Sequence, residues 1–406
     1  MTRLPRGMTL IEIMVAGTIL AVVLTGAMSL LMTVNQSSER VRRVGDTQEA
    51  ARLALEQLAA DIRSAGMGAQ FGSVGVAPAS GNVRRVPVIY SGADLVVNDG
   101  PVVAGVSATT IATNSIFIIS GQPTTGVLSS DGSGMVGTVT GAGVSTTLTI
   151  ACSNGVGTAV DCTDTSFVTA GDDYRVLVPI TGGFQPLIIG DFRNAVYLRP
   201  TTVTSLTGTP PVQTMDFVER TANAFSPDPR APFGFAPGAS LQRARVLHYY
   251  LWPSADGTYY ELKRSSPVLS SNAGNRACDG TDTPFVDETN TANGVKGVVI
   301  GSGPIHSLQI RYVTDASASD DPTQFQLSQL GVCSTALMPF LREIRLQVVA
   351  RSLAADKNIT DSAKRATYST PGFEGTSTAN PAAGDAYPRR TFSISVVPRN
   401  LQGVRL

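Results

Sequence analysis

The sequence predicts an α+β protein, in which one long N-terminal helix comes before a body of antiparallel strands. Three observations carry this prediction. Residues 8–34 form an almost wholly apolar run, and a helical stripe of apolar and small residues continues from it to residue 65. From about residue 69 the chain changes to short β-branched or aromatic runs separated by Gly, Ser, Thr and Asp, which is typical of strands and turns.

A short basic leader, MTRLPRG, occupies residues 1–7, and Glu12 is the single ionisable side chain in the apolar run that follows. About 20 apolar residues are enough to cross a bilayer, so we predict a transmembrane and assembly helix over residues 8–34. Arg3 and Arg6 ahead of the run place its N-terminal end in the cytoplasm and the long downstream chain outside. A carboxylate inside a membrane segment indicates a functional role and a partner of opposite charge.

Residues 35–68 continue the helix as an amphipathic segment that packs on the body. The result is one helix of roughly 55 residues. An interruption would fall near Gly45, and Gly66 and Gly68 are the predicted stop signals. The stripe consists of Leu30, Val34, Ser37, Val41, Val44, Gln48, Ala51, Leu55, Leu58, Ile62 and Ala65.

Residues 69–240 are predicted as a variable β-rich region, closed by a Pro- and Gly-rich boundary loop at residues 226–240. Antiparallel strands and hairpins are expected there. The predicted strands are residues 115–120, 136–140, 146–151, 175–180, 186–189 and 195–198.

Residues 241–406 are predicted as a second β-rich region. Asp256-Gly257 supplies the turn chemistry of a hairpin. Residues 341–352 alternate between apolar and polar side chains, as a half-buried strand does. The hairpin strands are residues 245–252 and 258–264; strands at 307–313, 341–352 and 389–401 follow, with a polar loop at 354–388.

Composition limits the class of protein. The chain has 406 residues, with 31 basic and 31 acidic side chains, so no net field points to nucleic acid as a partner. Charged residues make up only 15%, and Gly, Ser, Thr and Pro are abundant. This balance suits a β-rich domain outside the cytoplasm better than a cytosolic helical enzyme.

The cysteines would then lie in an oxidising compartment, where three pairings are open. Cys152 and Cys162 bracket a Gly-rich loop and favour a local bridge, which leaves Cys278 with Cys333. Buried free thiols are the alternative.

Catalytic patterns are not found. Neither Gly-x-Ser-x-Gly nor His-Glu-x-x-His occurs, and a Gly-x-Gly-x-x-Gly at residues 132–137 precedes a strand-like run, not the helix that a dinucleotide site needs. His248 and His306 are predicted as packed or surface side chains and not as general bases. We therefore predict a protein that is not an enzyme.

No cofactor or metal is expected, and calcium is the one alternative. Two acidic clusters lack EF-hand spacing and are interpreted as polar turns. They are Asp279, Asp282, Asp287 and Glu288, and Asp315, Asp320 and Asp321.

The run Gly7, Met8-Thr9-Leu10-Ile11-Glu12-Ile13-Met14 resembles the N-terminus of type IV prepilins and type II secretion pseudopilins. The resemblance implies that a prepilin peptidase cleaves after Gly7 and methylates the new amine of Met8. It also implies that Glu12, the fifth residue of the mature chain, neutralises the amine of a neighbouring subunit. Met8 stands where the family usually has Phe.

Further segments resemble PilW-type minor pilins: RLALEQLAADIRSAG at residues 52–66, the hairpin of residues 245–264 and the closing strand at 389–401. The resemblance implies a pilin-like fold, with the long helix packed on an antiparallel sheet and a large β-rich insertion. It implies a minor pilin, held in the inner membrane with its head in the periplasm, that primes the type IV pilus used for twitching motility and reaches the fibre tip. Its implied partners are other minor pilins, the major pilin, the prepilin peptidase, the inner-membrane assembly platform and a tip adhesin.

Other interpretations stay open. A J-type minor pseudopilin would share the fold and Glu12 but serve protein secretion. A signal-anchored periplasmic binding module would keep its site in residues 73–240 and would not be cleaved at Gly7. An ordinary secretory signal peptide has a shorter apolar region with a small-residue cleavage site after it.

Overall fold

The fold was described on a computed structural model of the chain. The structure describes residues 9–69, 72–76, 84–91, 95–98, 110–113, 115–128, 147–153, 159–160, 179–180, 183–190, 195–203, 213–217, 240–254, 260–269, 285–286, 289–290, 294–295, 298–300, 305–314, 341–351, 389–398 and 400.

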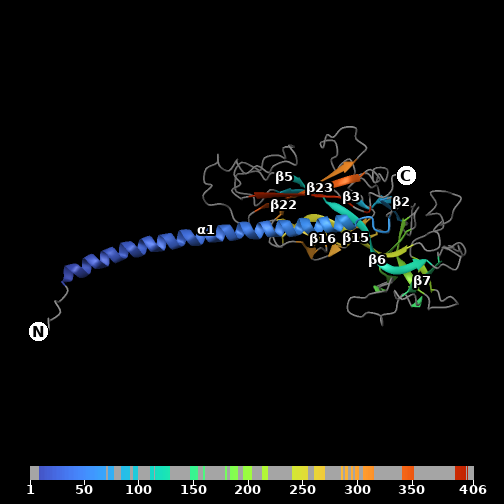
Figure 1. The fold of residues 1–406 in the computed structure, drawn as a ribbon, viewed down its shortest axis with the longest axis horizontal. Coiled ribbons are helices and arrows are strands. Elements are labelled where there is room, and N and C mark those ends of the chain that lie inside the picture. Colours follow the sequence, from blue (N-terminus) through green and yellow to red (C-terminus); the bar gives the residue numbers. More distant parts are fainter. Residues whose placement is uncertain are drawn as a thin grey trace.

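A single helix, α1 (Leu10–Ser64), dominates the molecule and projects far beyond the β-rich head (Figure 1). Thr9 caps its first turn, and the helix runs unbroken through Gly45, where an interruption was expected. It continues because a single Gly costs a helix only about 1 kcal/mol. Gly66 and Gly68 follow the helix with φ of 75° and 81°, the left-handed conformation that ends helices. The predicted helix and its stop are thus confirmed.

The largest sheet joins strands from both predicted β regions. Its order is β13-β14-β7-β6-β15-β11-β12-β1-β2, with β3, β8, β16 and β21 paired off this path. The strand β15 lies between β6 and β11, so residues 240–253 share a sheet with strands of the middle region. The strands are β1 (Ser73–Val76), β2 (Arg84–Pro87), β3 (Ile89–Ser91), β6 (Ile116–Leu128), β7 (Thr147–Ser153), β8 (Ala159–Val160), β11 (Leu187–Gly190), β12 (Ala195–Leu198), β13 (Pro200–Val203), β14 (Gln213–Phe217), β15 (Ser240–Pro253), β16 (Tyr260–Ser265) and β21 (Val298–Val299).

One pair in this sheet departs from the antiparallel prediction. Strands β1 and β12 run parallel, with Gly75 opposite Val196. The chain reaches β12 only through the hairpin from β11, and β11 is antiparallel to both β12 and β15. The antiparallel pairing with β11 sets the direction of β12, and β1 pairs with its other edge in the same direction.

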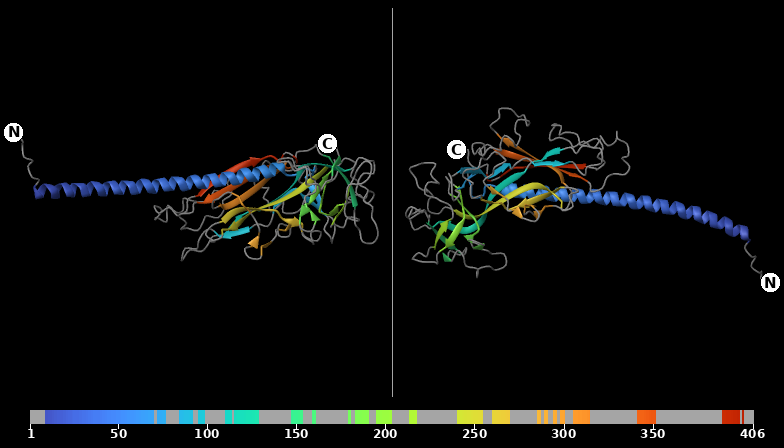
Figure 2. Two further views of the ribbon diagram at one scale, coloured as in Figure 1. Left: turned by 90° about the horizontal axis from the view of Figure 1, so that it is seen from below. Right: turned by 180° about the vertical axis from the view of Figure 1, so that it is seen from behind.

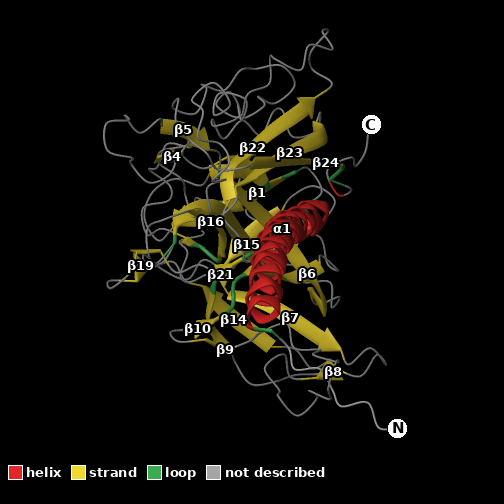
Figure 3. Cartoon of the chain, turned by 90° about the vertical axis from the view of Figure 1, so that its left-hand side faces the viewer, coloured by secondary structure: helices red, strands yellow, loops and turns green. Residues whose placement is uncertain are grey.

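A second sheet, β22-β23-β24, is antiparallel throughout. Its strands β22 (Ile305–Thr314), β23 (Leu341–Arg351) and β24 (Arg389–Val396) match the three strands predicted in the C-terminal region. Viewed from the N-terminal side of the helix, this sheet lies toward one side of α1, and β6, β7 and β14 lie toward the other (Figure 3). Short two-stranded sheets complete the described strands: β4 (Leu95–Asn98) with β5 (Thr110–Thr113), β9 (Pro179–Ile180) with β10 (Gly183–Phe184), β17 (Val268–Leu269) with β18 (Phe285–Val286), and β19 (Thr289–Asn290) with β20 (Gly294–Val295).

The core lies where the last four turns of α1 meet both sheets. From residue 50 onward one helix face is buried, and Leu58 and Ile62 are fully enclosed. Burying such a side chain contributes about 1.5–3 kcal/mol. Small Ala residues on the same face let the helix approach the strands closely. The buried face consists of Ala50, Ala51, Ala54, Leu55, Leu58, Ala59, Asp61, Ile62 and Ala65.

Some of the predicted strands lie in described strands, and others lie outside the described residues. Residues 115–120, 146–151, 186–189 and 195–198 fall in or largely within β6, β7, β11 and β12, and the predicted hairpin is the antiparallel pair β15–β16. Of residues 175–180 only the last two, in β9, are described. The predicted strand at 136–140 and the polar loop at 354–388 lie outside the described residues. So does the boundary loop at 226–240, except for Ser240, which is the first residue of β15.

Candidate functional site

The N-terminal part of α1 is a fully exposed apolar helix. Residues 10–39 meet the length and composition of a membrane span, and none of the best window is buried by the head. In water such a surface would be unfavourable, because each large apolar side chain left exposed forfeits its burial energy. Its large exposed side chains are Leu10, Ile11, Ile13, Met14, Val15, Ile19, Leu20, Val22, Val23, Leu24, Met28, Leu30, Leu31, Met32 and Val34.

Glu12 lies in the first turn of this helix and takes part in a capping box. The Thr9 amide donates to Glu12 Oε2 at 2.9 Å, and the Glu12 amide donates to Thr9 Oγ1 at 3.4 Å. The box satisfies two backbone donors at the helix start and keeps the carboxylate near the positive end of the helix dipole. Among the described residues the carboxylate bonds only Thr9, so it retains acceptor capacity for another group.

A polar stretch of the same helix separates the apolar part from the head. Residues 35–49 carry Glu39, Arg42, Asp46 and Glu49, and every side chain described there is exposed. At about 1.5 Å per residue this stretch is about 22 Å long. The head therefore stands well away from the end of the apolar segment, as Figure 2 shows from two sides.

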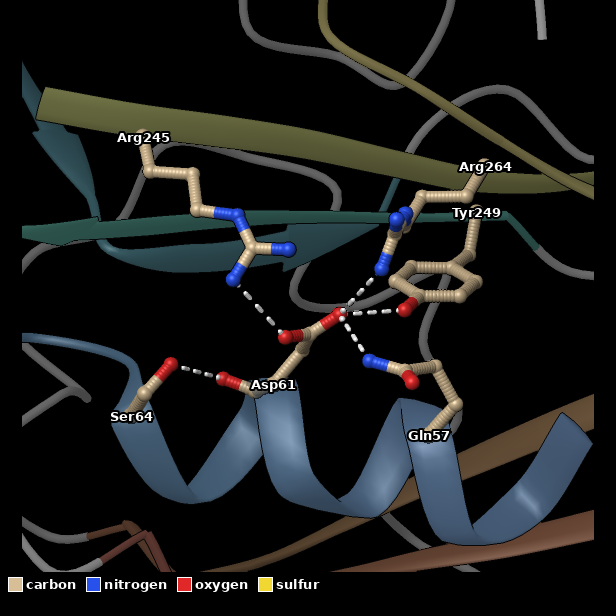
Figure 4. A network of polar contacts seen from close by, with 6 residues as sticks. All are labelled: Gln57, Asp61, Ser64, Arg245, Tyr249 and Arg264. Carbon is tan, nitrogen blue, oxygen red and sulfur yellow. Dashed lines mark hydrogen bonds and ion pairs between the residues drawn. The ribbon is translucent and has the colours of Figure 1, made fainter. Parts of the chain in front are cut away.

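Side chains of the head bind the last turns of α1 through the carboxylate of Asp61, which is only 4% exposed. Arg245 on β15 lies 3.2 Å from Oδ1, and Arg264 on β16 lies 3.5 Å from Oδ2 (Figure 4). The Gln57 amide donates to Oδ2 at 3.3 Å, and the Tyr249 hydroxyl donates to the same oxygen. Burial, followed by the bond to Asp61, raises the pKa of Tyr249. A buried carboxylate is stable only when it is paired in this way.

No sequence pattern predicts this cluster as a whole, although a partial signal is present. Asp61 stands three residues after Leu58 and four before Ala65, within the apolar stripe. Arg245 and Tyr249 are four residues apart in one strand and so share a face. What no sequence pattern states is that this strand face lies opposite that helix face.

The end of α1 is held by the C-terminal segment and by β6. Asn400 Nδ2 donates to the carbonyls of Ser64 at 3.4 Å and Ala65 at 3.2 Å. The Gly66 amide donates to the Ile119 carbonyl at 3.0 Å. The two Asn400 bonds satisfy carbonyls that a helix C-terminus otherwise leaves open, and the Gly66 bond ties the residue after the helix to β6.

The remaining predicted site residues are described only in part. Gly7 and Met8 lie outside the described residues, as do Cys162, Cys278 and Cys333 and both acidic clusters, so the cleavage site, the disulfides and calcium stay predictions. Cys152 lies in β7 opposite Val160 of β8, two residues before Cys162. Within the described part of the chain, no group of three His, Cys, Asp or Glu side chains could hold a metal.

His248 packs against other rings. It stacks on Phe117 at 3.9 Å between ring centroids and on Tyr250 at 4.7 Å. Its placement in a ring stack agrees with the prediction of a packed side chain.

Comparison with known proteins adds one match. The family model of the prokaryotic N-terminal methylation motif matches residues 3–28. No curated protein and no solved structure matches the chain. The motif implies association with a prepilin peptidase and with pilus assembly machinery in general. The methylation motif, the exposed apolar helix and the β-rich body together support a membrane-anchored, type IV pilin-like or pseudopilin-like structural protein.

Proposed function

We propose that the chain is a PilW-type minor pilin that is anchored in the inner membrane and helps to prime the pilus and form its tip. One observation carries the proposal: the methylation motif leads directly into an apolar helix that the head leaves uncovered. A soluble protein would bury that surface, whereas a pilin subunit moves it from lipid into a bundle of like helices.

Maturation would begin with cleavage after Gly7 and methylation of the Met8 amine. The mature chain then starts one residue before the Thr9 cap, and its positive amine lies in the apolar layer. A charge of either sign is costly there, and pairing with an opposite charge offsets much of the cost. Glu12 supplies that opposite charge to the amine of a neighbouring subunit and so sets the axial register between two helices.

Extraction from the membrane would keep the apolar surface covered. Residues 10–34 span about 38 Å at 1.5 Å per residue, enough for the hydrocarbon core of a bilayer. Neighbouring pilin helices replace the lipid without exposing that surface to water. The head stays intact, because its packing against α1 begins only at residue 50.

Placement at the tip is supported by bulk and by reach. The head occupies most of the 406 residues, and wide heads are difficult to stack repeatedly in a narrow fibre. The polar stretch at residues 35–49 holds this head clear of the apolar helix end. A subunit that is placed once, at the tip, does not have to stack its head on copies of itself.

The decisive experiment is the mass of the mature N-terminal peptide from membranes with and without active prepilin peptidase. We expect a peptide that begins at N-methylated Met8 and appears only with active peptidase. A peptide that begins at Met1, or beyond residue 34, would refute the proposal. Deletion of the gene then separates two alternatives. Loss of pili indicates the minor pilin, and loss of protein secretion indicates a J-type pseudopilin.

A further inference from the structure

The strand β24 forms a long and open sheet edge. It has 8 residues, pairs only with β23 among the described strands, and keeps a continuous register from Arg351–Arg389 to Ile344–Val396. Thr391, Ser393 and Ser395 are exposed, whereas Phe392 and Ile394 pack against the core. Figures 1 and 2 show the strand, in dark red, running alongside α1, which it contacts.

In the two larger described sheets, the edges formed by β2, β13, β21 and β22 differ from β24, because each is blocked, short or covered. The β2 edge contains Arg84, Arg85 and Pro87. The β13 edge contains Pro200 and a register shift, and β21 is only 2 residues long. The remaining edge of the second sheet, β22, lies against β15 and β16. Proline, charge, bulges and short length are the usual means by which proteins prevent edge-to-edge association.

The segment of β24 after its two arginines has none of these features. Between Thr391 and Val396 there is no proline, no charged residue and no bulge. Every second residue of an edge strand directs its N–H and C=O groups away from the sheet. No described residue binds those groups in β24, so the edge is a template for another strand.

We propose that β24 binds an extended strand from a different polypeptide of the assembly, which becomes the fourth strand of the β22-β23-β24 sheet. Antiparallel pairing is the more stable arrangement and brings the C-terminal end of the added strand to exposed Arg390. The strand that fits carries an acidic residue at that end. Its alternate side chains are apolar, because they continue the row of Phe392 and Ile394 toward α1.

A second copy of this chain does not fit the edge in the antiparallel arrangement proposed here. Antiparallel pairing of β24 with its own copy creates a two-fold axis and reverses the direction of the subunit along the strand. Because β24 runs alongside α1, the two helices would point in opposite directions (Figure 1). Two copies inserted in one membrane with the same orientation cannot meet in this way. The inference rests on the proposed function only in that the partner is assembled beside this chain.

The test places the photo-cross-linking residue p-benzoylphenylalanine at Thr391 of the full chain in native membranes. The matched control carries it at Val298, which is 64% exposed on the short β21 edge. We expect a cross-link from position 391 to one extended segment of another polypeptide, identified by peptide mass, with at least tenfold lower yield from position 298. Equal yields, no cross-link at 391, or a cross-link to another copy of this chain would overturn the proposal.

Two proline variants show whether the backbone edge is responsible. In neighbouring residues the N–H groups point to opposite sides of a strand, so Ser393→Pro and Ile394→Pro block opposite edges of β24. Because Ile394 packs against the core, the Tm of each proline variant is compared with that of the alanine variant at the same position. The proline that lowers the Tm no further than its alanine is the one that blocks the outer edge, and it should lose the cross-link at least tenfold. If that variant cross-links normally, the strand-addition model fails. If the cross-link is absent while Met8 is processed and the subunit assembles, the proposed function stands without it.

Discussion

The hydroxyl of Tyr249 donates a hydrogen bond to the carboxylate of Asp61, and the two residues lie 188 positions apart in the chain. Tyr249 comes from β15 at the centre of the large sheet, and Asp61 comes from the buried face of α1. Both side chains are enclosed, and Arg245 and Arg264 approach the carboxylate from the same sheet. The link between α1 and the head is therefore polar at its centre and apolar around it.

Replacing Asp61 by Asn should weaken this link. The amide is nearly isosteric, but it leaves the two arginines without a counter-charge, and it places an NH₂ group where one acceptor oxygen stood. Because Arg245 and Arg264 are 33% and 26% exposed, water offsets part of the loss, and we expect a cost of about 1–3 kcal/mol. Denaturant unfolding of the full chain in detergent micelles measures it.

The matched control is Glu56→Gln on the same helix. Glu56 pairs with Arg52 on the exposed side, and such pairs contribute little to stability. Equal unfolding midpoints for the Asp61 and Glu56 variants would show that the buried cluster contributes nothing special.

Two buried tyrosines should respond oppositely to the loss of their hydroxyls. Tyr249→Phe removes a donor to Asp61 and should cost about 1–2 kcal/mol. Tyr312 is buried in β22, and its hydroxyl has no partner among the described residues, so Tyr312→Phe should be neutral or stabilising. Thermal unfolding of both variants in micelles is the measurement, and equal losses would contradict the assignment of partners.

The same tyrosines predict an alkaline limit to stability. Burial raises the pKa of Tyr312, and burial together with Asp61 raises the pKa of Tyr249. Unfolded tyrosine titrates near pH 10. The contribution of both residues is therefore complete below about pH 10 and declines above it, because the unfolded chain then releases protons that the folded chain retains. The decline should be shallower in either Phe variant, and an unchanged slope in both would argue against this origin.

Asn400 should be important as the C-terminal cap of α1. Asn400→Ala removes two hydrogen bonds to helix carbonyls and should cost about 0.5–1.5 kcal/mol. Asn400→Asp should cost more, because a negative charge at this end opposes the helix dipole. Amide exchange in the last turn of α1 and the unfolding midpoint together test whether the Asp variant is less stable than the Ala variant. A more stable Asp variant would exclude the capping role.

Gly121 should tolerate no side chain. A Cβ there would lie 2.1 Å from Gln242 Oε1 and 2.8 Å from the Met67 carbonyl, so Gly121→Ala should cost about 1–3 kcal/mol. Gly45 is the comparison, since a Cβ there meets nothing within 4 Å and the residue is inside a helix. Gly45→Ala should stabilise the helix by about 1 kcal/mol. Circular dichroism measures helicity and the unfolding midpoints measure stability. A Gly45→Ala variant less stable than Gly121→Ala would contradict the prediction.

Glu12→Gln should separate membrane insertion from assembly. The variant remains apolar enough to insert and keeps the Thr9 cap, since Gln also serves in a capping box. Under the proposed function the charge of Glu12 neutralises the amine of a neighbouring subunit, and a neutral Gln would not. We expect normal cleavage after Gly7 and at least a tenfold loss of the subunit from sheared fibres. Glu49→Gln, in the exposed polar stretch, is the control and should assemble normally.

Local features of this protein could be predicted from the sequence because their causes are local. The apolar run, the helical stripe and the glycines at residues 66 and 68 determine α1 from its first turn to its end. Alternation and turn chemistry determine the β15–β16 hairpin and the strands β23 and β24. The methylation motif is likewise contiguous, and the carboxylate of Glu12 lies within it.

Only the tertiary structure decided which surfaces meet. The parallel pairing of β1 with β12, the placement of β15 between β6 and β11, and the carboxylate cluster at Asp61 all join residues far apart in the chain. A period of 2 or 3.6 residues states which face of an element is buried but not what it is buried against. The partners of Asp61, and the open edge of β24, follow from how the helix and the two sheets pack together.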